Sequence, residues 1–346
     1  MINYPPRISL AQTPTPLHPL KRLQASIGGP LIWLKRDDLT GATLSGNKVR
    51  KLEFIAAKAQ QQDCSALITC GGIQSNHCRA TALVAAQLGL KCHLILRGIP
   101  SQHQLSDGNQ LLDELSGCTI SYHKPAEYFT QLDNIFAQVS KDFAEQGDKA
   151  LVIPTGGSDG DGLWGYIAAC EELKNDFAQH QINPSAIITA SGSGGTQAGL
   201  VVGAQLFDLA ASVYGINVCD DETYFVNKIA ADIQDWQTKY PEQAKQLKLP
   251  SNQSEDLINI IDGYVGNGYG IASDEVIDSI RLLARTEGVV LDPVYSGKAF
   301  NGLLTEIANG RFNSAADTAA ENIVFIHTGG VFGLFAFKEQ FSDANS

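Results

Sequence analysis

The feature that most constrains the fold of this chain is a regular alternation of short apolar runs with amphipathic helical patterns. Apolar runs typical of buried strands occupy residues 66–69, 92–96, 151–153, 186–189, 213–218 and 323–326. Helical patterns cover residues 77–88, 129–146, 164–173, 196–206, 228–247 and 273–286. Because strand–helix units repeated in this way build parallel sheets, we predict an α/β fold with helices on both faces of mostly parallel sheets.

The chain has 346 residues, which is long enough for two domains of about 150 residues each. No internal repeat or proline-rich linker separates them, so we expect the domain boundaries at short crossings. One crossing is expected near residues 52–54 and the other in the glycine-rich run 155–162. These crossings predict a large domain of residues 1–53 and 162–346, into which a smaller α/β domain of residues 54–161 is inserted.

Charge and cysteine content limit the partners and the compartment. The net charge of −12 and the isoelectric point of about 5.0 argue against a nucleic-acid or membrane partner. The seven cysteines form no CxxC pair, and the first residues lack the apolar core of a signal peptide. We therefore expect reduced thiols in a cytoplasmic protein. The acidic stretch 220–222 is expected to be a solvated loop, and no metal is predicted.

A glycine-rich segment, residues 190–199, follows a predicted strand and opens a predicted helix. Glycines let the backbone approach an anion, and the amides and dipole of a helix N-terminus attract negative charge. We predict a phosphate site there; the alternative is an ordinary glycine-rich turn. Gln197 breaks the dinucleotide fingerprint, and Val49 replaces the hydroxyl of a P-loop at residues 41–48, so a monophosphate fits better. The predicted site consists of Ser191, Gly192, Ser193, Gly194, Gly195 and Thr196.

Lys48 follows a Gly-Asn turn at a predicted helix start, close in sequence to Arg50 and Lys51. Positive neighbours and a helix N-terminus both destabilise an ammonium group, and a lysine with a lowered pKa is suited to Schiff-base chemistry. The alternative for Lys48 is an exposed basic helix turn. Residues 70–77 form a second strand-to-helix junction, in which Ser75 and Asn76 could bind a carboxylate or simply cap the helix.

Six separated motifs together resemble the D-cysteine desulfhydrase and 1-aminocyclopropane-1-carboxylate (ACC) deaminase family. They are residues 46–53, 72–77, 191–199, 268–270, 291–298 and 327–330, and the match runs from about residue 15 to residue 337. Members of that family are pyridoxal-phosphate (PLP) enzymes of fold type II, the tryptophan-synthase-β-like fold. The resemblance therefore implies PLP as the cofactor, a small amino acid as the substrate, and a homodimer.

The resemblance also assigns roles to individual residues. Lys48 would carry PLP through a Schiff base, Asn76 would hold the ring 3-hydroxyl, and Ser191 to Thr196 would bind the phosphate. Ser75, with the amides of Asn76 and His77, would bind the substrate carboxylate. Tyr269 and Tyr295 would lie beside the substrate, and Ser296 and Thr328 would lie near the pyridine nitrogen. Four of these residues are implied to be catalytic: Lys48, Ser75, Tyr269 and Tyr295.

One departure bears on the reaction. ACC deaminases carry Glu where this chain has Ser296, and a carboxylate would keep the pyridine nitrogen protonated for ring opening. A hydroxyl favours elimination of a good leaving group instead. We therefore predict α,β-elimination of D-cysteine to pyruvate, ammonia and sulfide. ACC deaminase and L-cysteate sulfo-lyase are the alternatives within the family, and a non-catalytic PLP- or anion-binding protein is the alternative outside it.

Overall fold

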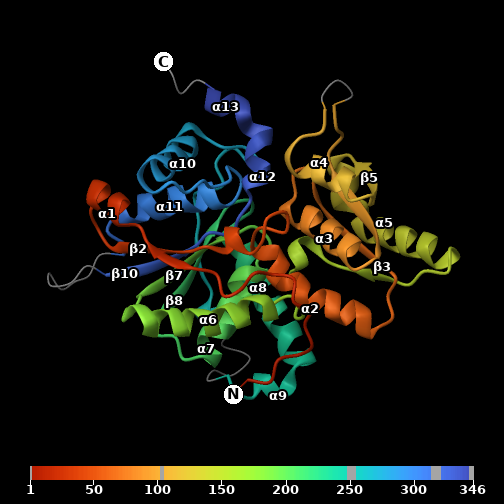
Figure 1. Ribbon diagram of the computed structural model, residues 1–346, viewed down its shortest axis with the longest axis horizontal. Helices are drawn as coiled ribbons and strands as arrows, with labels where there is room; N and C mark the ends of the chain where they lie inside the picture. The colour runs from red at the N-terminus through yellow and green to blue at the C-terminus, as the bar shows by residue number, and fades with distance from the viewer. Residues whose placement is uncertain (1, 102–104, 248–254, 313–320, 343–346) are drawn as a thin grey trace.

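The computed structural model describes residues 2–101, 105–247, 255–312 and 321–342. Its ten strands form two sheets of six and four strands, side by side in Figure 1. The larger sheet has the order β1 (Leu17–Pro19), β2 (Leu31–Lys35), β10 (Asn322–Ile326), β7 (Ala186–Ser191), β8 (Ser212–Asn217) and β9 (Asn259–Ile261). The smaller sheet has the order β5 (Thr119–His123), β4 (Lys91–Arg97), β3 (Ala66–Gly72) and β6 (Ala150–Val152). Only β1 runs antiparallel to its neighbour among these strands.

Helices cover both faces of each sheet. One face of the larger sheet packs on α6 (Trp164–His180), α7 (Gly195–Leu206) and α8 (Glu222–Lys239), and the other on α1 (Lys21–Ile27), α10 (Asp274–Glu287) and α11 (Ser296–Ala308). The smaller sheet lies between α5 (Pro125–Glu145) on one face and α2 (Asn47–Gln61) with α3 (Asn76–Gln87) on the other. The remaining helices are α4 (Gly108–Leu115), α9 (Pro241–Ala244), α12 (Val331–Leu334) and α13 (Lys338–Ser342), with 3-10 turns at Asp37–Leu39, Thr155–Gly157 and Phe335–Phe337.

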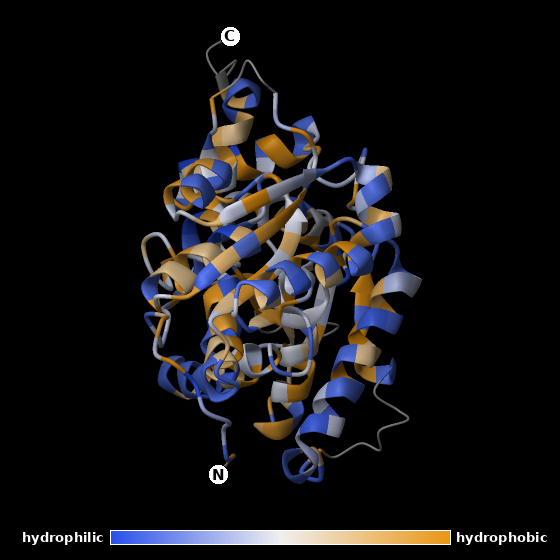
Figure 2. Ribbon diagram, turned by 90° about the vertical axis from the view of Figure 1, so that its right-hand side faces the viewer, coloured by the Kyte–Doolittle hydropathy of each residue, from blue (hydrophilic) through white to orange (hydrophobic). Residues whose placement is uncertain are grey.

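The alternation of residue types explains this layering. Strands β7 and β3 are buried along almost their whole length, as expected for parallel strands covered on both faces. In Figure 2 apolar residues gather along the inner strands, while the outer faces of the helices are hydrophilic. No described helix combines the length with the apolar content that a bilayer span requires.

The structure confirms the predicted α/β class and all six predicted strands, with boundaries shifted by a few residues. The predicted helix over residues 228–247 is wrong in its second half. Helix α8 ends at Lys239, and Pro241 begins the separate short helix α9. Proline has no amide hydrogen to donate and clashes with the preceding turn, so it starts a helix but does not continue one.

The positions of the two sheets along the chain agree with the predicted insertion of the smaller domain into the larger one. All strands of the smaller sheet fall within residues 66–152, and all strands of the larger sheet fall outside that range. We keep the division into two domains as a proposal. The first boundary, at residues 53–54, lies inside the continuous helix α2, so the connection there is a helix rather than a loop.

Candidate active site

A cavity of about 590 Å³ lies between the two sheets, where strands β3, β4, β7 and β8 end. The carboxyl ends of parallel strands are the usual position of ligand sites in α/β folds, because the loops there converge. Most of the residues predicted for the site line this cavity: Lys48, Ser75, Asn76, His77, Gly192, Ser193, Gly194, Thr196, Tyr269, Tyr295 and Thr328. Ser191, Gly195 and Ser296 are buried behind the cavity wall.

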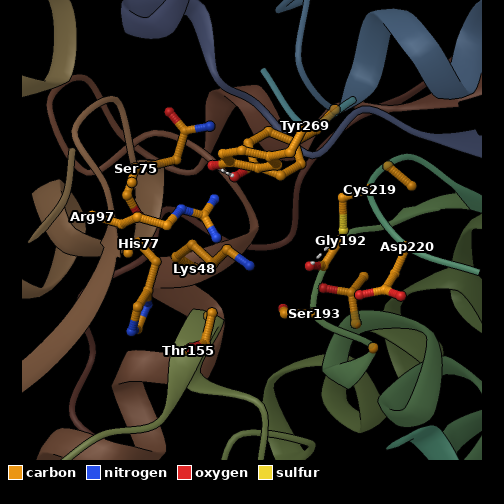
Figure 3. Close-up of a pocket in the computed structure, with 18 of the residues that line it drawn as sticks. Lys48, Ser75, His77, Arg97, Thr155, Gly192, Ser193, Cys219, Asp220 and Tyr269 are labelled. Carbon is orange, nitrogen blue, oxygen red and sulfur yellow. Dashed lines mark hydrogen bonds between the residues drawn. The ribbon is translucent and has the colours of Figure 1, made fainter. Parts of the chain in front are cut away.

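Lys48 is the second residue of α2 and extends into the cavity (Figure 3). Gly46 precedes the helix with φ of +108°, and a β-carbon there would lie 2.8 Å from the Thr328 carbonyl oxygen, so this tight turn requires glycine. No hydrogen bond or ion pair joins the Lys48 ammonium to any described residue. The surrounding protein lowers the pKa of Lys48 to about 8, because burial disfavours the charged form. Lys48 is therefore a free amine that is easily deprotonated.

The other lysines near the cavity are held by partners. Lys51 donates to the Gly156 carbonyl oxygen at 3.1 Å and to Ser158 Oγ at 3.2 Å. Lys298 donates to two backbone carbonyl oxygens at 2.6 and 2.8 Å. Lys228 pairs with Asp232 at 2.5 Å. Of these amines, only Lys48 has its nitrogen available for covalent chemistry.

The glycine-rich segment forms a cradle at the N-terminus of α7. Gly194 precedes the helix with φ of +82°, and Gly194 and Thr196 line the cavity at this helix start, while the Gly195 amide donates to Ser158 Oγ at 3.2 Å. Ser193 Oγ lies 2.9 Å from Ser158 Oγ, and Asn47 donates to Thr196 Oγ1 at 2.9 Å. Ser191 Oγ instead donates to Gln197 at 2.5 Å and holds the start of the helix from behind. Hydroxyls, helix amides and the nearby lysines make this segment suitable for a phosphate monoester.

The N-terminus of α3 forms the opposite wall. Ser75 is its N-cap and accepts from the Cys78 amide at 3.2 Å, which leaves the amides of Asn76 and His77 free of helical partners. The two expectations for this junction are therefore compatible, because a capped helix start is also an anion site. His77 is buried, and burial lowers its pKa well below the usual value. Its ring is therefore neutral, with Nε2 2.8 Å from Thr69 Oγ1, and its backbone amide lies at the helix start.

A relay of amides orients Asn76. Arg79 Nε donates to Asn109 Oδ1 at 3.2 Å, and Asn109 Nδ2 donates to Asn76 Oδ1 at 2.9 Å. Because arginine cannot accept a hydrogen bond, it fixes the orientation of both amides in turn. Asn76 Nδ2 is consequently left as a donor on the cavity side, where it can bind an oxygen of a ligand.

The two predicted tyrosines are brought together from different loops. The hydroxyls of Tyr269 and Tyr295 lie 2.5 Å apart, and the rings meet edge to face. Burial raises the pKa of both phenols above the usual value, most strongly for Tyr295. Both are therefore protonated at neutral pH and act as hydrogen-bond donors.

The structure distinguishes between the two hydroxyls expected near a pyridine nitrogen. Thr328 lines the cavity. Ser296 is completely buried, and its Oγ donates to Asp292 Oδ1 at 2.6 Å. Asp292 also accepts from the amides of Val294, Tyr295 and Ser296, so Ser296 belongs to the network that holds this loop. Of the two residues, Thr328 is the one that lines the cavity, and the assignment of either hydroxyl to the nitrogen stays a prediction.

Comparison with known proteins supplies the family. The model of the pyridoxal-phosphate dependent enzymes matches residues 8–329. This chain is a member of that family. Its cofactor is PLP, as the sequence motifs predicted, and the fold is that of the type II PLP enzymes.

Three named relatives cover almost all of this PLP enzyme. It is 40% identical over 331 residues to a putative 1-aminocyclopropane-1-carboxylate deaminase from Thermotoga maritima, covering 95% of this chain and 98% of that protein. It is 39% identical to a bifunctional D-cysteine desulfhydrase/1-aminocyclopropane-1-carboxylate deaminase, mitochondrial, from Arabidopsis thaliana (96% and 80%) and 38% identical to a D-cysteine desulfhydrase from Klebsiella pneumoniae (96% of each). The crystal structure of an ACC deaminase homologue superimposes with a TM-score of 0.84 at 32% identity, covering 97% and 96%. The resemblance to this family is confirmed.

The donor groups of the cavity fit PLP. Lys48 offers a free amine to the aldehyde of PLP, and the cradle at α7 offers a site for its phosphate. Asn76 offers a donor to the ring oxygen of PLP, and Thr328 offers a hydroxyl group to the ring nitrogen. The glycine at position 156 also agrees with a bound cofactor. A β-carbon there would lie 2.2 Å from Ser193 Oγ and 3.2 Å from Lys48 Nζ, and would fill space between the amine and the glycine-rich loop. The individual roles remain proposals.

Sequence reasoning missed part of the cavity wall. Arg97, Tyr128, Thr155 and Cys219 all line the cavity. Two of these residues could have been found: Arg97 directly follows the predicted strand 92–96, and Thr155 begins the glycine-rich run that was interpreted as a domain crossing. Nothing local distinguishes Tyr128 or Cys219, because other elements bring them to the site.

Proposed function

We propose that this enzyme is a lyase that eliminates sulfide from D-cysteine and yields pyruvate and ammonia. The observation that carries this choice of reaction is the wall near Tyr295 and Thr328: the lining residues described on that wall carry hydroxyl groups and no carboxylate. The acidic side chain in that lining is Asp220, which lies with Gly192 and Ser193 on another wall (Figure 3). A hydroxyl beside the ring nitrogen suffices for expelling a good leaving group, whereas opening a cyclopropane ring at carbon needs a stronger electron sink.

When bound, PLP supplies an electrophilic ring system that stabilises the electron pair left on Cα after proton removal. The protein supplies the base. Because burial lowers the pKa of Lys48 to about 8, roughly a tenth of this amine is neutral at pH 7, far more than for an ordinary lysine, and the neutral form can accept the Cα proton.

Two further groups orient the substrate. The free amides of Asn76 and His77 at the start of α3 bind the α-carboxylate, assisted by the helix dipole and the Ser75 hydroxyl. The Tyr269–Tyr295 pair presents protonated phenols at the cavity wall, where a hydroxyl can donate to the departing group.

A panel of five amino acids tests the proposal: D-cysteine, L-cysteine, β-chloro-D-alanine, ACC and L-cysteate, each scored for keto acid and ammonia, with sulfide or sulfite measured where sulfur leaves. We expect turnover of D-cysteine and β-chloro-D-alanine and little of ACC. ACC turnover equal to or faster than that of D-cysteine would refute the proposal in favour of ACC deaminase. Sulfite release from L-cysteate as the fastest reaction would indicate the sulfo-lyase instead. Bound PLP without any turnover would support the non-catalytic alternative.

We also propose a cytoplasmic location and a homodimer. All seven cysteines are free thiols, which agrees with a reducing compartment. Analytical ultracentrifugation of the purified enzyme, over a range of concentrations, tests the dimer.

A further inference from the structure

One charged side chain in the cavity has no partner of opposite charge. Arg97 is the last residue of β4, and no hydrogen bond or ion pair joins its guanidinium to any residue that the structure describes. Three aromatic rings surround it instead: Arg97 Cζ lies 4.7 Å from the ring centre of Tyr269, 4.9 Å from that of Phe129 and 5.6 Å from that of Tyr128. Rings stabilise a nearby cation but do not satisfy its in-plane N–H donors. The guanidinium is therefore held in place with donors available to a ligand.

The position of Arg97 places these donors beside the substrate site. Arg97 pairs in register with Gly72 on the neighbouring strand, and that strand leads directly into Ser75 and helix α3. In Figure 3 the Arg97 side chain passes between Ser75 and Lys48 and extends toward Tyr269. A β-carbon at Gly72 would lie 3.4 Å from the Tyr269 ring, which is van der Waals contact and places the tyrosine beside this strand end. Arg97 thus lies between the proposed carboxylate site and the tyrosine pair.

The α-carboxylate of the substrate does not need Arg97 for binding. The amides at the start of α3 already provide a site for that group. Asp220, the acidic residue among the described lining residues, lies on another wall beside Ser193 and is not paired with Arg97 (Figure 3). A guanidinium fork matches a carboxylate or sulfonate through two parallel hydrogen bonds, which a neutral substituent cannot form.

We propose that Arg97 is a specificity-determining residue that binds a negatively charged group on Cβ of the amino-acid substrate. This inference rests on the proposed function, in which the α3 N-terminus holds the α-carboxylate and the Cβ substituent points toward Tyr269. In that reaction the sulfur departs as an anion on the Arg97 side. The thiolate that forms as the sulfur leaves is such a group. A carboxylate or sulfonate on Cβ would occupy the same guanidinium fork, so we expect amino acids with an acidic Cβ substituent to bind as ligands at the D-cysteine site.

Ligand binding to the PLP-loaded enzyme tests this assignment. D-Aspartate and D-alanine differ by one Cβ carboxylate, and their dissociation constants can be measured from the change in visible absorbance. We expect D-aspartate to bind at least about tenfold more tightly, the value of one charge-assisted hydrogen bond. Arg97→Gln should remove the preference without weakening D-alanine, and Arg97→Lys should retain part of it because the charge remains. D-Cysteate measured in parallel distinguishes a sulfonate site from a carboxylate site.

Lys124→Gln is the matched control, since Lys124 is exposed and its substitution removes one positive charge outside the cavity. It should leave the preference unchanged. The proposal is overturned if the unmodified enzyme binds both ligands equally, or if Arg97→Gln weakens both by the same factor, which would assign Arg97 to the α-carboxylate. Binding requires no turnover, so these outcomes are separate from failure of the proposed elimination, which the substrate panel reports.

Discussion

Gly156 offers the sharpest test of how the cavity is built. It lies in the turn Thr155–Gly157 with φ of +69°, a backbone conformation that side chains rarely adopt. A β-carbon there would lie 2.2 Å from Ser193 Oγ, 2.8 Å from Ser193 Cβ and 3.2 Å from Lys48 Nζ. Rotation of the Ser193 hydroxyl would not relieve the second overlap, so Gly156→Ala must displace the phosphate loop itself, by roughly half an ångström or more.

Two effects of the substitution can be separated by a control. Gly147 has a similar φ of +82°, but a β-carbon there would meet no atom within 4 Å, and the residue lies on the surface far from the cavity. Gly147→Ala should therefore show the backbone strain alone, about 1–2 kcal/mol of lost stability. Gly156→Ala should add about 1–3 kcal/mol for the overlap. It should also weaken PLP binding by about tenfold, the loss of one good hydrogen bond to the phosphate.

The assay combines thermal unfolding of both variants with PLP titration of the apoenzymes, followed by visible absorbance. Elimination kinetics add a third readout, since moving a reacting group by about 1 Å can cost about 100-fold in rate. If Gly156→Ala binds PLP and turns over substrate as well as Gly147→Ala does, the cofactor does not occupy the space between Lys48 and Ser193, and the proposed arrangement is refuted.

Four further predictions follow from the same geometry. Lys48→Ala should abolish both elimination and the borohydride-reducible PLP adduct; peptide mapping that finds the adduct on Lys51 or Lys298 would contradict the assignment. The rate of PLP recombination with apoenzyme should rise with pH through a midpoint near 8, because only the neutral amine of Lys48 reacts. At pH 7 the neutral fraction of Lys48 is about 300-fold higher than that of a lysine with a pKa of 10.5. Gly194→Asp should weaken PLP binding by about tenfold or more, since it adds a negative charge and a side chain at a positive-φ position of the phosphate loop; an unchanged titration would make the loop a simple turn. Ser296→Glu should lower the rate of D-cysteine elimination, because it disrupts the hydrogen bond from Ser296 to the buried Asp292 carboxylate. A variant as fast as the parent enzyme would show that this hydrogen bond is dispensable.

The sequence was informative wherever function depends on local chemistry. Parallel strands and amphipathic helices follow from the spacing of apolar residues, because a strand buried on both faces needs a continuous apolar run. The glycine-rich segment 190–199 and Lys48 could also be predicted to lie at helix starts, since such a turn is contained within a few consecutive residues, and both line the cavity. The end of α8 was equally local, and Pro241 could have predicted it.

Tertiary structure decided what depends on residues far apart in the chain. Ser296 and Thr328 are equivalent candidates by residue type, and only the burial of Ser296 against Asp292 separates them. The relay from Arg79 through Asn109 to Asn76 has no sequence pattern, because its members meet only when α3 packs on α4. The end of the predicted strand 92–96 could have indicated Arg97, but its surroundings could not be predicted, because the Tyr269 ring, 4.7 Å from Arg97 Cζ, comes from a loop more than 170 residues away in sequence. Local sequence determines which groups a segment can present, whereas the packing of the two sheets determines which of those groups share one cavity.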